Sequence, residues 1–316
     1  MIKVAIVGVG GMGSTHFNLY RGMNDVEIVA LVDVEPEKTA EKAKACGARS
    51  YTNIEDMLKN EKPDIADICT PSYFHCANAV AAMEKGCHVI TEKPAALNTR
   101  DVMRMFTCAE ENNVFFMVAH VLRFWPEYVW LKNTVDSGKY GKLLHLAMWR
   151  TGDRPRNSWQ NWMLVQEKSG LVPFDLHIHD IDFMVYLLGE PNKTDKYQIN
   201  NGAGQYVETT CQYKNGTRVH AKAAWYNGCV PFTMGYEAQF EMGYADFRKD
   251  LLVFYPNDVE PETPTVTSIF TGSEINVANT SGYLNELKFF IQCVTSGKKP
   301  DIMTQSEILI TLALLS

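Results

Sequence analysis

A glycine-rich stretch near the start of the chain constrains its fold more than any other feature. Val4-Ala-Ile-Val7 is a continuous apolar run, and glycines follow it at Gly8, Gly10 and Gly13. An unbroken apolar run is typical of a parallel strand buried on both faces. In a dinucleotide-binding turn, the first glycine permits the tight turn and the second lets the backbone approach a pyrophosphate. The third lets the following helix pack closely on the sheet.

The neighbouring sequence favours dinucleotide binding over an ordinary glycine turn. Ser14 to Arg21 is a plausible helix, whose N-terminal N–H groups and dipole would face the phosphates. A second apolar run, Val26 to Val32, ends at Asp33, an acid about twenty residues beyond the glycines. Asp33 is expected to bind ribose hydroxyls and to repel a 2′-phosphate, which Val34 cannot offset, so NAD is favoured over NADP. A solvated loop acid is the alternative interpretation of Asp33.

Length and composition exclude several classes of protein. The 316 residues suffice for two domains, and 46% hydrophobic with 21% charged residues is typical of a soluble globular protein. A net charge of −7 gives no case for a nucleic-acid partner, and no apolar run reaches the roughly eighteen residues of a membrane helix. The chain starts directly in a predicted strand, and its eight cysteines show no CxxC spacing. We expect a cytoplasmic protein without disulfides, membrane contact or nucleic-acid partners.

The first half of the chain alternates strands with helices. After the glycines we expect strands at 64–69, 88–91 and 114–119 and helices at 35–46, 54–59, 74–85 and 99–111. Such alternation requires right-handed crossovers and a parallel sheet, so the predicted fold class is α/β, with a doubly wound domain over residues 1–122. Ligands of such sheets lie beyond the carboxyl ends of the strands. The later strand ends carry Thr70-Pro71-Ser72 and Glu92-Lys93-Pro94.

Lys93 is a candidate active-site residue at one of these strand ends. It lies between Glu92 and Pro94, where a side chain points towards a bound cofactor and the proline restricts the local backbone. The alternative is a salt-bridged surface lysine, the usual environment of a lysine.

The second half, residues 123–316, has a different pattern. We expect a helix at 126–137, a long polar loop at 151–168 and closing helices at 281–295 and 305–315. Strands are predicted at 143–151, 198–200, 206–213, 218–226, 237–242 and 251–255. This pattern predicts a large, mostly antiparallel open sheet backed by helices. Strands 206–213 and 218–226 carry apolar side chains on both faces, so we expect the broad face of the sheet to pack against another subunit.

One predicted helix, Phe174 to Leu188, concentrates polar residues. Spacings of four and seven place Asp175, His179 and Asp182 on one helical face, whereas His177 and Asp180 point elsewhere. A single-metal site needs convergent ligands, so this divergence argues against a metal. The alternative interpretation of His179 alone is a histidine at the edge of the core.

Together these motifs resemble the glucose–fructose oxidoreductase, inositol dehydrogenase and rhizopine-catabolism (Gfo/Idh/MocA) family of oxidoreductases. The resemblance runs over essentially the whole chain and includes Tyr283-Leu-Asn-Glu-Leu-Lys-Phe-Phe near its end. The other motifs that carry it are Gly8-Val-Gly-Gly-Met-Gly13, Cys69-Thr-Pro71 with His75, Gly86-Cys-His-Val-Ile-Thr-Glu-Lys-Pro94, Arg123-Phe-Trp-Pro126 and Asp175-Leu-His-Ile-His179-Asp-Ile-Asp182.

The resemblance implies a Rossmann domain, a C-terminal α/β domain on an open sheet, and NAD(P)-dependent oxidation or reduction of a sugar, cyclic polyol or related substrate. It further implies dimers or tetramers built on that sheet, a cis Lys93–Pro94 bond, and Lys93, Asp175 and His179 as catalytic residues. The positions implied in cofactor binding are Gly8, Gly10, Gly11, Met12, Gly13, Asp33, Thr70, Pro71, His75, Glu92 and Lys93.

The chain departs from the family pattern beside the catalytic aspartate. Ser169-Gly-Leu-Val-Pro173-Phe stands where three glycines are common, and His177 replaces a glycine two residues after Asp175. Neither change removes a catalytic group. Both alter the expected shape of the substrate pocket and so leave the substrate open.

The chemistry assigns a role to each candidate. His179 suits a general base because its ordinary pKa lies near neutrality, and Asp175 would orient the substrate. Lys93 would stabilise charge on the reacting oxygen, or relay the proton if its pKa is depressed. Arg123, Trp159 and Trp162 are candidate substrate contacts, with core or loop packing as the alternative. The other functions left open are an NAD(P)- or sugar-sensing regulator without turnover and an enzyme that uses tightly held NAD for transient oxidation.

Overall fold

The computed structural model describes residues 1–201, 204–266 and 281–316, which fall into two compact units. The first contains Met1–His120 and Tyr283–Gln305, and the second contains 121–266 and Ser306–Ser316. This differs from the expected division into 1–122 and 123–316, because a late helical segment belongs to the first unit. There, Met303 Sδ accepts a hydrogen bond from the Val118 N–H (3.2 Å) on the edge strand of the first sheet.

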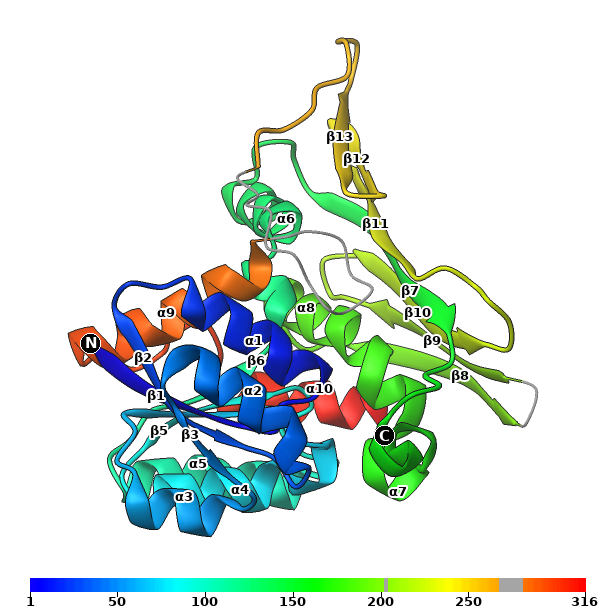
Figure 1. The fold of residues 1–316 in the computed structure, drawn as a ribbon. Coiled ribbons are helices and arrows are strands. Elements are labelled where there is room, and N and C mark those ends of the chain that lie inside the picture. The colour runs from blue at the N-terminus through cyan, green and yellow to red at the C-terminus, as the bar shows by residue number, and fades with distance from the viewer. Residues whose placement is uncertain (202–203, 267–280) are drawn as a thin grey trace. The chain divides into compact units, whose positions relative to one another are not determined.

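The first unit is built on a six-stranded, wholly parallel sheet in the order β3-β2-β1-β4-β5-β6 (Figure 1). Strands β1, β4 and β6 are mostly apolar and almost completely buried, as the continuous apolar runs predict. The short strand β3 was missed by the sequence analysis. The strands are β1 (Ile2–Val7), β2 (Val26–Val32), β3 (Arg49–Tyr51), β4 (Ile65–Ile68), β5 (His88–Glu92) and β6 (Phe116–Ala119).

Helices cover both faces of this sheet. In Figure 1, α3, α4 and α5 lie side by side along one face and α1 lies on the other. Two helices start at an asparagine whose side chain accepts a backbone N–H of the first turn, Asn53 for α3 and Asn98 for α5. The helices are α1 (Gly11–Arg21), α2 (Pro36–Cys46), α3 (Ile54–Asn60), α4 (His75–Met83), α5 (Thr99–Glu111) and α9 (Gly282–Ser296), with the short 3₁₀ turn η1 (Ser72–Phe74) before α4.

The second unit contains a sheet of seven described strands in the order β13-β12-β11-β7-β10-β9-β8. All neighbouring pairs are antiparallel except the central β7–β10 pair, which is parallel. Strand β12 was missed by the sequence analysis. The strands are β7 (Leu143–Asp153), β8 (Lys193–Asn201), β9 (Gly204–Gln212), β10 (Arg218–Tyr226), β11 (Thr233–Phe240), β12 (Gly243–Arg248) and β13 (Leu251–Pro256).

Helices pack on one face of this second sheet. Their core is aromatic: the Tyr128 ring makes edge contacts with Phe183, Tyr236 and Phe247 at centroid distances of 4.8, 5.2 and 5.8 Å. The helical elements are η2 (Val121–Phe124), α6 (Pro126–Ser137), η3 (Trp159–Leu164), α7 (Gln166–Ser169), η4 (Pro173–His177), α8 (Ile178–Leu188) and α10 (Gln305–Leu315).

The opposite face of the sheet is not apolar, although the sequence analysis expected it to be so for strands 206–213 and 218–226. Strands β9 and β10 alternate: Val207 and Ala221 are buried against the helices, whereas Glu208 and Lys222 on the other face are partly exposed. This face is therefore mainly polar at its centre, because a side-chain period of two separates the two sets. Large apolar side chains are exposed towards its margins, at Tyr197, Ile199, Tyr226, Leu251 and Tyr255.

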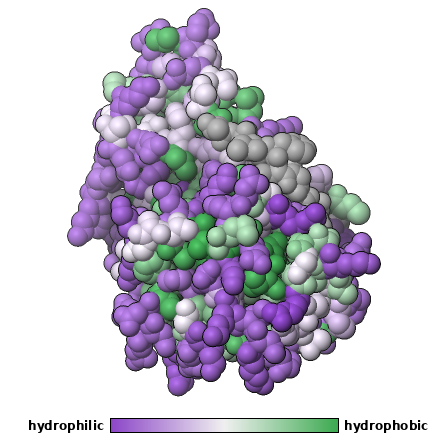
Figure 2. Space-filling model, turned by 60° about the vertical axis from the view of Figure 1, so that its left-hand side comes forward, coloured by the Kyte–Doolittle hydropathy of each residue, from purple (hydrophilic) through white to green (hydrophobic). Residues whose placement is uncertain are grey.

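The surface view in Figure 2 has mainly hydrophilic residues, with smaller apolar areas between them. Within the described ranges, every helix is too short or too polar to cross a membrane. All eight cysteines are free thiols in this structure.

Candidate active site

The glycine loop joins β1 to α1 and has the geometry that a phosphate requires. Gly8 has a φ of 91°, and a Cβ there would lie 2.7 Å from backbone atoms of Cys69 and Thr70. A Cβ on Gly13 would lie 1.9 Å from the Gly8 carbonyl oxygen. Gly10, in contrast, has nothing within 4 Å of its Cβ position. Gly8 and Gly13 thus allow the chain to pack, and Gly10 leaves open space at the N-terminus of α1, where a pyrophosphate fits.

The next two residues, Gly11 and Met12, form the first turn of α1. Gly11 is exposed and Met12 partly exposed, so their backbone N–H groups lie at the accessible end of the helix. These N–H groups have no carbonyl partner within the helix, because the first turn of a helix leaves its donors unpaired.

Asp33 lies beside this loop, at the end of β2. Its Oδ2 accepts the Val9 N–H (2.8 Å) and its Oδ1 accepts the Glu35 N–H (3.0 Å). The carboxylate is thereby fixed next to the glycines while each oxygen keeps a second lone pair. Val34 is 61% exposed, so the residue after Asp33 adds no charge there.

The end of β4 carries Thr70 and Pro71, followed by His75 at the start of α4. The His75 imidazole is buried, with Nε2 2.7 Å from the Thr70 carbonyl oxygen and Nδ1 2.7 Å from the Pro94 carbonyl oxygen. The Thr70 hydroxyl accepts a hydrogen bond from Asn78 Nδ2 (3.2 Å). The His75 ring therefore contacts backbone at this edge of the sheet, and its role in cofactor binding stays a prediction.

The end of β5 presents Glu92, Lys93 and Pro94, and the Lys93–Pro94 bond is cis, as expected. Lys93 is partly exposed. Glu92 is buried, its Oε2 accepts the Lys93 N–H (3.1 Å), and burial raises the pKa of its carboxyl group. Glu92 thus binds the backbone of the lysine that the motif analysis singled out.

A buried polar cluster behind this edge was missed by the sequence analysis. His16 Nδ1 is 2.8 Å from Asp67 Oδ2, and its Nε2 is 3.5 Å from Glu92 Oε1. Cys69 Sγ donates to Asp67 Oδ1 (3.3 Å). Burial alone would lower the pKa of His16, but the Asp67 carboxylate and, to a lesser extent, Glu92 outweigh it and raise the pKa. The cluster lies within metal-ligand spacing, yet its groups already bond to one another, so we read it as structural support for Glu92.

In the second unit, Asp175 and His179 lie on consecutive helical segments. Asp175 belongs to η4, a π-helical turn that starts at Pro173, and His179 is in the first turn of α8. The expected single α-helix from 174 to 188 therefore begins with a wider turn, a feature that is frequent at functional sites. Asp175 is partly exposed, and His179 is 9% exposed.

The two polar residues that were expected to diverge do face the sheet. His177 Nε2 lies 2.8 Å from Thr209 Oγ1 on β9, and burial lowers the pKa of His177 to about 3. Asp180 Oδ1 lies 3.5 Å from Arg150 Nη2 on β7, and burial raises the pKa of Asp180 to about 6. His177, which departs from the family pattern, thus anchors the segment that carries Asp175 and His179 to the sheet.

The three expected substrate contacts differ in exposure. Arg123 has a 1% exposed side chain that binds Asp182 and Glu307, so its guanidinium lies inside the second unit. Trp159 and Trp162 are partly exposed on η3, which contains the left-handed residues Gln160 and Asn161. The tryptophans therefore remain candidates for a sugar face, and Arg123 has the environment of a structural residue.

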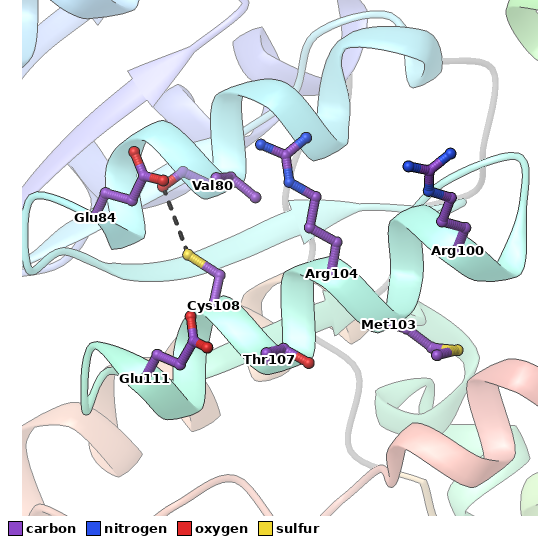
Figure 3. Close-up of a pocket in the computed structure, with 8 residues that line it drawn as sticks. All are labelled: Val80, Glu84, Arg100, Met103, Arg104, Thr107, Cys108 and Glu111. Atoms are coloured by element: carbon purple, nitrogen blue, oxygen red, sulfur yellow. Dashed lines mark hydrogen bonds between the residues drawn. The ribbon is translucent and has the colours of Figure 1, made fainter.

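A surface groove between α4 and α5 is separate from all of these residues. Its lining includes Val80 from α4, Glu84 directly after that helix, and Arg100, Arg104 and Glu111 from α5 (Figure 3). Most of its side chains are exposed, and none belongs to the motifs above.

Two family models match the chain. The model of the oxidoreductase family with an NAD-binding Rossmann fold matches residues 2–120, and the model of the GFO/IDH/MocA C-terminal domain matches residues 128–237. The chain belongs to the Gfo/Idh/MocA family of oxidoreductases. Its first unit is therefore the NAD-binding Rossmann domain of that family, with the glycine loop and Asp33 at the expected place.

Two curated relatives of this chain have names that state different activities. The 2,7-anhydro-N-acetylneuraminate hydratase of Mediterraneibacter gnavus is 30% identical over 188 residues, which is 60% of this chain and 50% of the relative. The inositol 2-dehydrogenase of Salmonella paratyphi B is 28% identical over 201 residues, 62% of this chain and 57% of the relative. The chain spans about half the length of the curated relatives it matches.

Among solved structures, levoglucosan dehydrogenase in complex with NADH and levoglucosan has the same fold. Its TM-score is 0.85 at 19% identity, with 99% of this chain and 95% of that chain covered.

Proposed function

We propose that this protein is an NAD-dependent dehydrogenase that oxidises a secondary hydroxyl of a sugar, cyclic polyol or related substrate. The observation that carries the proposal is that Lys93, Asp175 and His179 are all present in a chain whose two halves match both domains of the family. A regulator without turnover would have no need to keep these three groups. The names of the inositol and levoglucosan dehydrogenases support the substrate class.

Three side chains have different roles in the oxidation of the reacting hydroxyl. His179 takes the hydroxyl proton, since a neutral imidazole is a competent base near pH 7. Lys93 donates to the same oxygen and stabilises the negative charge that develops there. Asp175 accepts a hydrogen bond from an adjacent hydroxyl and fixes the orientation of the ring. NAD, when bound, supplies the hydride acceptor.

The residues that would hold NAD are those at the carboxyl edge of the parallel sheet. The N–H groups of Gly10, Gly11 and Met12 serve the pyrophosphate, and Asp33 serves the adenosine ribose. The Asp33 charge would repel a 2′-phosphate. Lys38, a cation near Asp33, is already paired with Glu35. The site therefore prefers NAD over NADP.

A second function is favoured by one comparison. The hydratase relative bears the name of a reaction without net redox change. The corresponding proposal for this chain is an enzyme that keeps NAD tightly bound, oxidises its substrate transiently and reduces it again. The same three residues would serve, because the first step is the same proton removal.

A substrate panel distinguishes these functions. Purified protein is incubated with NAD and a set of inositols, aldoses, anhydrosugars and sugar acids, and NADH is followed by absorbance while products are followed by mass spectrometry. We expect NADH to accumulate with a polyol or sugar, and not with the Lys93→Met variant. Product without NADH, together with NAD released on denaturation, supports transient oxidation. Neither product nor NADH across the panel would leave the regulator as the better explanation.

We further propose that the protein forms a homo-oligomer through the outer face of the second sheet. Tyr197 and Leu251, at opposite edges of that face, are 55% and 54% exposed. Such apolar residues around a polar centre are suited to contact with a second copy. Light scattering at micromolar concentration should give a dimer or tetramer mass, and Tyr197→Glu should lower it. A monomer at these concentrations contradicts the proposal.

A further inference from the structure

The ring of His75 faces two hydrogen-bond acceptors. Its Nδ1 is 2.7 Å from the carbonyl oxygen of Pro94, and its Nε2 is 2.7 Å from the carbonyl oxygen of Thr70. The residue is 1% exposed, so water does not replace either contact. A carbonyl oxygen only accepts hydrogen bonds, whereas a neutral imidazole has one donor and one acceptor nitrogen.

The neutral ring does not fit this environment. Its unprotonated nitrogen would point a lone pair at an oxygen 2.7 Å away. Turning the ring over would place carbon atoms at both positions, but C–H···O contacts are longer, about 3.3–3.6 Å. Two N–H donors satisfy both distances, and an imidazole with two N–H groups is the cation.

Other groups oppose the charge. Burial lowers the pKa of His75 below its ordinary value, the nearby Lys93 ammonium acts in the same direction, and the two carbonyl contacts offset only part of this lowering. His75 also begins α4, whose N-terminal dipole is positive. The two short contacts decide in favour of the cation, because both are hydrogen bonds only when both nitrogens carry a proton.

The two carbonyls belong to segments that form the candidate nucleotide edge. Thr70 packs against Gly8, the first glycine of the loop, where a Cβ would meet its backbone nitrogen at 2.7 Å. Pro94 directly follows Lys93. The His75 ring therefore joins the end of β4, which supports the glycine loop, to the end of β5, which carries the lysine.

We propose that His75 is a positioning residue whose doubly protonated ring holds the Thr70 and Pro94 carbonyls together and so sets the backbone of the glycine loop and of Lys93. The effect of His75 on catalysis rests on the proposed NAD-dependent function. The contacts of its ring with Thr70 and Pro94 do not depend on that function.

Nitrogen NMR tests the bonding in the protein without NAD or substrate. His88 on β5 is the internal reference, because its Nδ1 accepts the Phe115 N–H (2.8 Å) and must be unprotonated. At pH 7.5 we expect both ring nitrogens of His75 to have the shifts of protonated nitrogens, whereas His88 shows one protonated and one bare nitrogen. A His75 spectrum like that of His88 overturns the proposal.

Variants test the consequence. His75→Gln keeps two donors on one amide nitrogen, and His75→Leu keeps the volume without donors. We expect the His75→Leu variant to bind NAD roughly tenfold more weakly and to lower kcat more than it changes substrate KM. The His75→Gln variant should keep part of the NAD affinity and part of the kcat. Free imidazole should partly rescue His75→Ala. The matched control, His88→Leu, should bind NAD like the wild type.

The same variants also distinguish a folding defect from a loss of NAD binding. Each variant is first compared with the wild type by circular dichroism, and NAD affinity is measured by fluorescence, so that absent turnover does not affect the result. NAD binding by a folded His75→Leu variant with wild-type affinity contradicts the positioning role. If the variant does not fold, the NMR spectrum of the wild type and the imidazole rescue decide.

Discussion

Arg123 and Asp182 form a buried, two-point ion pair. Arg123 Nε is 2.9 Å from Asp182 Oδ2, Nη2 is 2.8 Å from Oδ1, and both side chains are 1% exposed. Arg123 Nη1 also lies 3.1 Å from Glu307 Oε2. Asp182 is three residues after His179 on α8, so the pair fixes the helix that carries the proposed base. The planar, bidentate geometry is one that a lysine cannot reproduce.

We predict that Arg123→Met destabilises the protein strongly. Removal of one partner leaves a buried carboxylate uncompensated, which costs about 3–5 kcal/mol. Urea unfolding of the whole protein measures this loss of stability. The control is Lys132→Met: Lys132 contacts the same Tyr186 ring as Arg123, but its ion pair with Asp136 is open to solvent on the Asp136 side, which is 54% exposed, and contributes at most about 1 kcal/mol. A stable Arg123→Met variant with raised substrate KM would instead restore Arg123 as a substrate contact.

His177 and Asp180 should give the stability of the protein opposite dependences on pH. The pKa of His177 is about 3 in the folded state, below its ordinary 6.5, so the unfolded chain binds more protons between these values. Stability from this residue therefore falls as the pH drops below about 6.5. The pKa of Asp180 is about 6, above its ordinary 3.8, so the folded chain binds more protons and stability falls as the pH rises through that window.

Unfolding of His177→Gln and Asp180→Asn at pH 5.0 and 7.5 separates the two effects. The stability lost in His177→Gln should be smaller at pH 5.0 than at 7.5. At pH 5.0 the wild type must release the proton of His177 when it folds, and this lowers its stability, whereas the variant has no such group. Asp180→Asn should compare more favourably with the wild type at pH 7.5 than at 5.0. Equal differences at both pH values would contradict the assigned charge states.

The catalytic assignment predicts distinct kinetic effects. Lys93→Met and His179→Ala should each lower kcat by about 10²–10⁴, the usual loss for an acid–base group. His179→Ala should leave NAD affinity almost unchanged, because its side chain is not in the Rossmann domain. Asp175→Asn keeps the size and part of the hydrogen bonding, so KM should rise with a smaller fall in kcat. Steady-state kinetics with a substrate from the panel measures all three.

The same assignment predicts a geometry. In a crystal structure with NAD and substrate, the side-chain ends of Lys93, Asp175 and His179 should lie within hydrogen-bond reach of one substrate. Three side chains directed at different surfaces would refute the assignment and favour the regulator.

Asp33 should make NAD the better cofactor by roughly one to two orders of magnitude in kcat/KM, at about 1.4 kcal/mol per factor of ten. The cause is repulsion of the 2′-phosphate together with loss of the ribose hydrogen bonds. Asp33→Asn removes the charge, keeps the shape and should narrow the ratio. Similar kcat/KM values of the wild type for NAD and NADP would disprove this role.

The sequence alone predicted the Rossmann sheet and Asp33 beside the glycine loop, and the family resemblance implied the cis bond after Lys93. The first two depend on short-range chemistry, because apolar runs select buried strands and glycines permit backbone that side chains exclude. The helical period also placed His177 and Asp180 away from Asp175 and His179, although a π-turn replaces the first turn of that helix.

Only the tertiary structure decided the partners of the buried polar residues. His16 contacts Asp67, which is fifty-one residues away in the sequence, and Arg123 contacts Asp182, which is fifty-nine residues away. The ring of His75 contacts the carbonyl oxygen of Pro94 at the end of the next strand. The parallel β7–β10 pair and the return of α9 to the first unit are likewise long-range. Sequence periodicity tells which face of an element is buried, but not which element covers it. That choice is made by the packing of the whole core, where each buried polar group must find a partner.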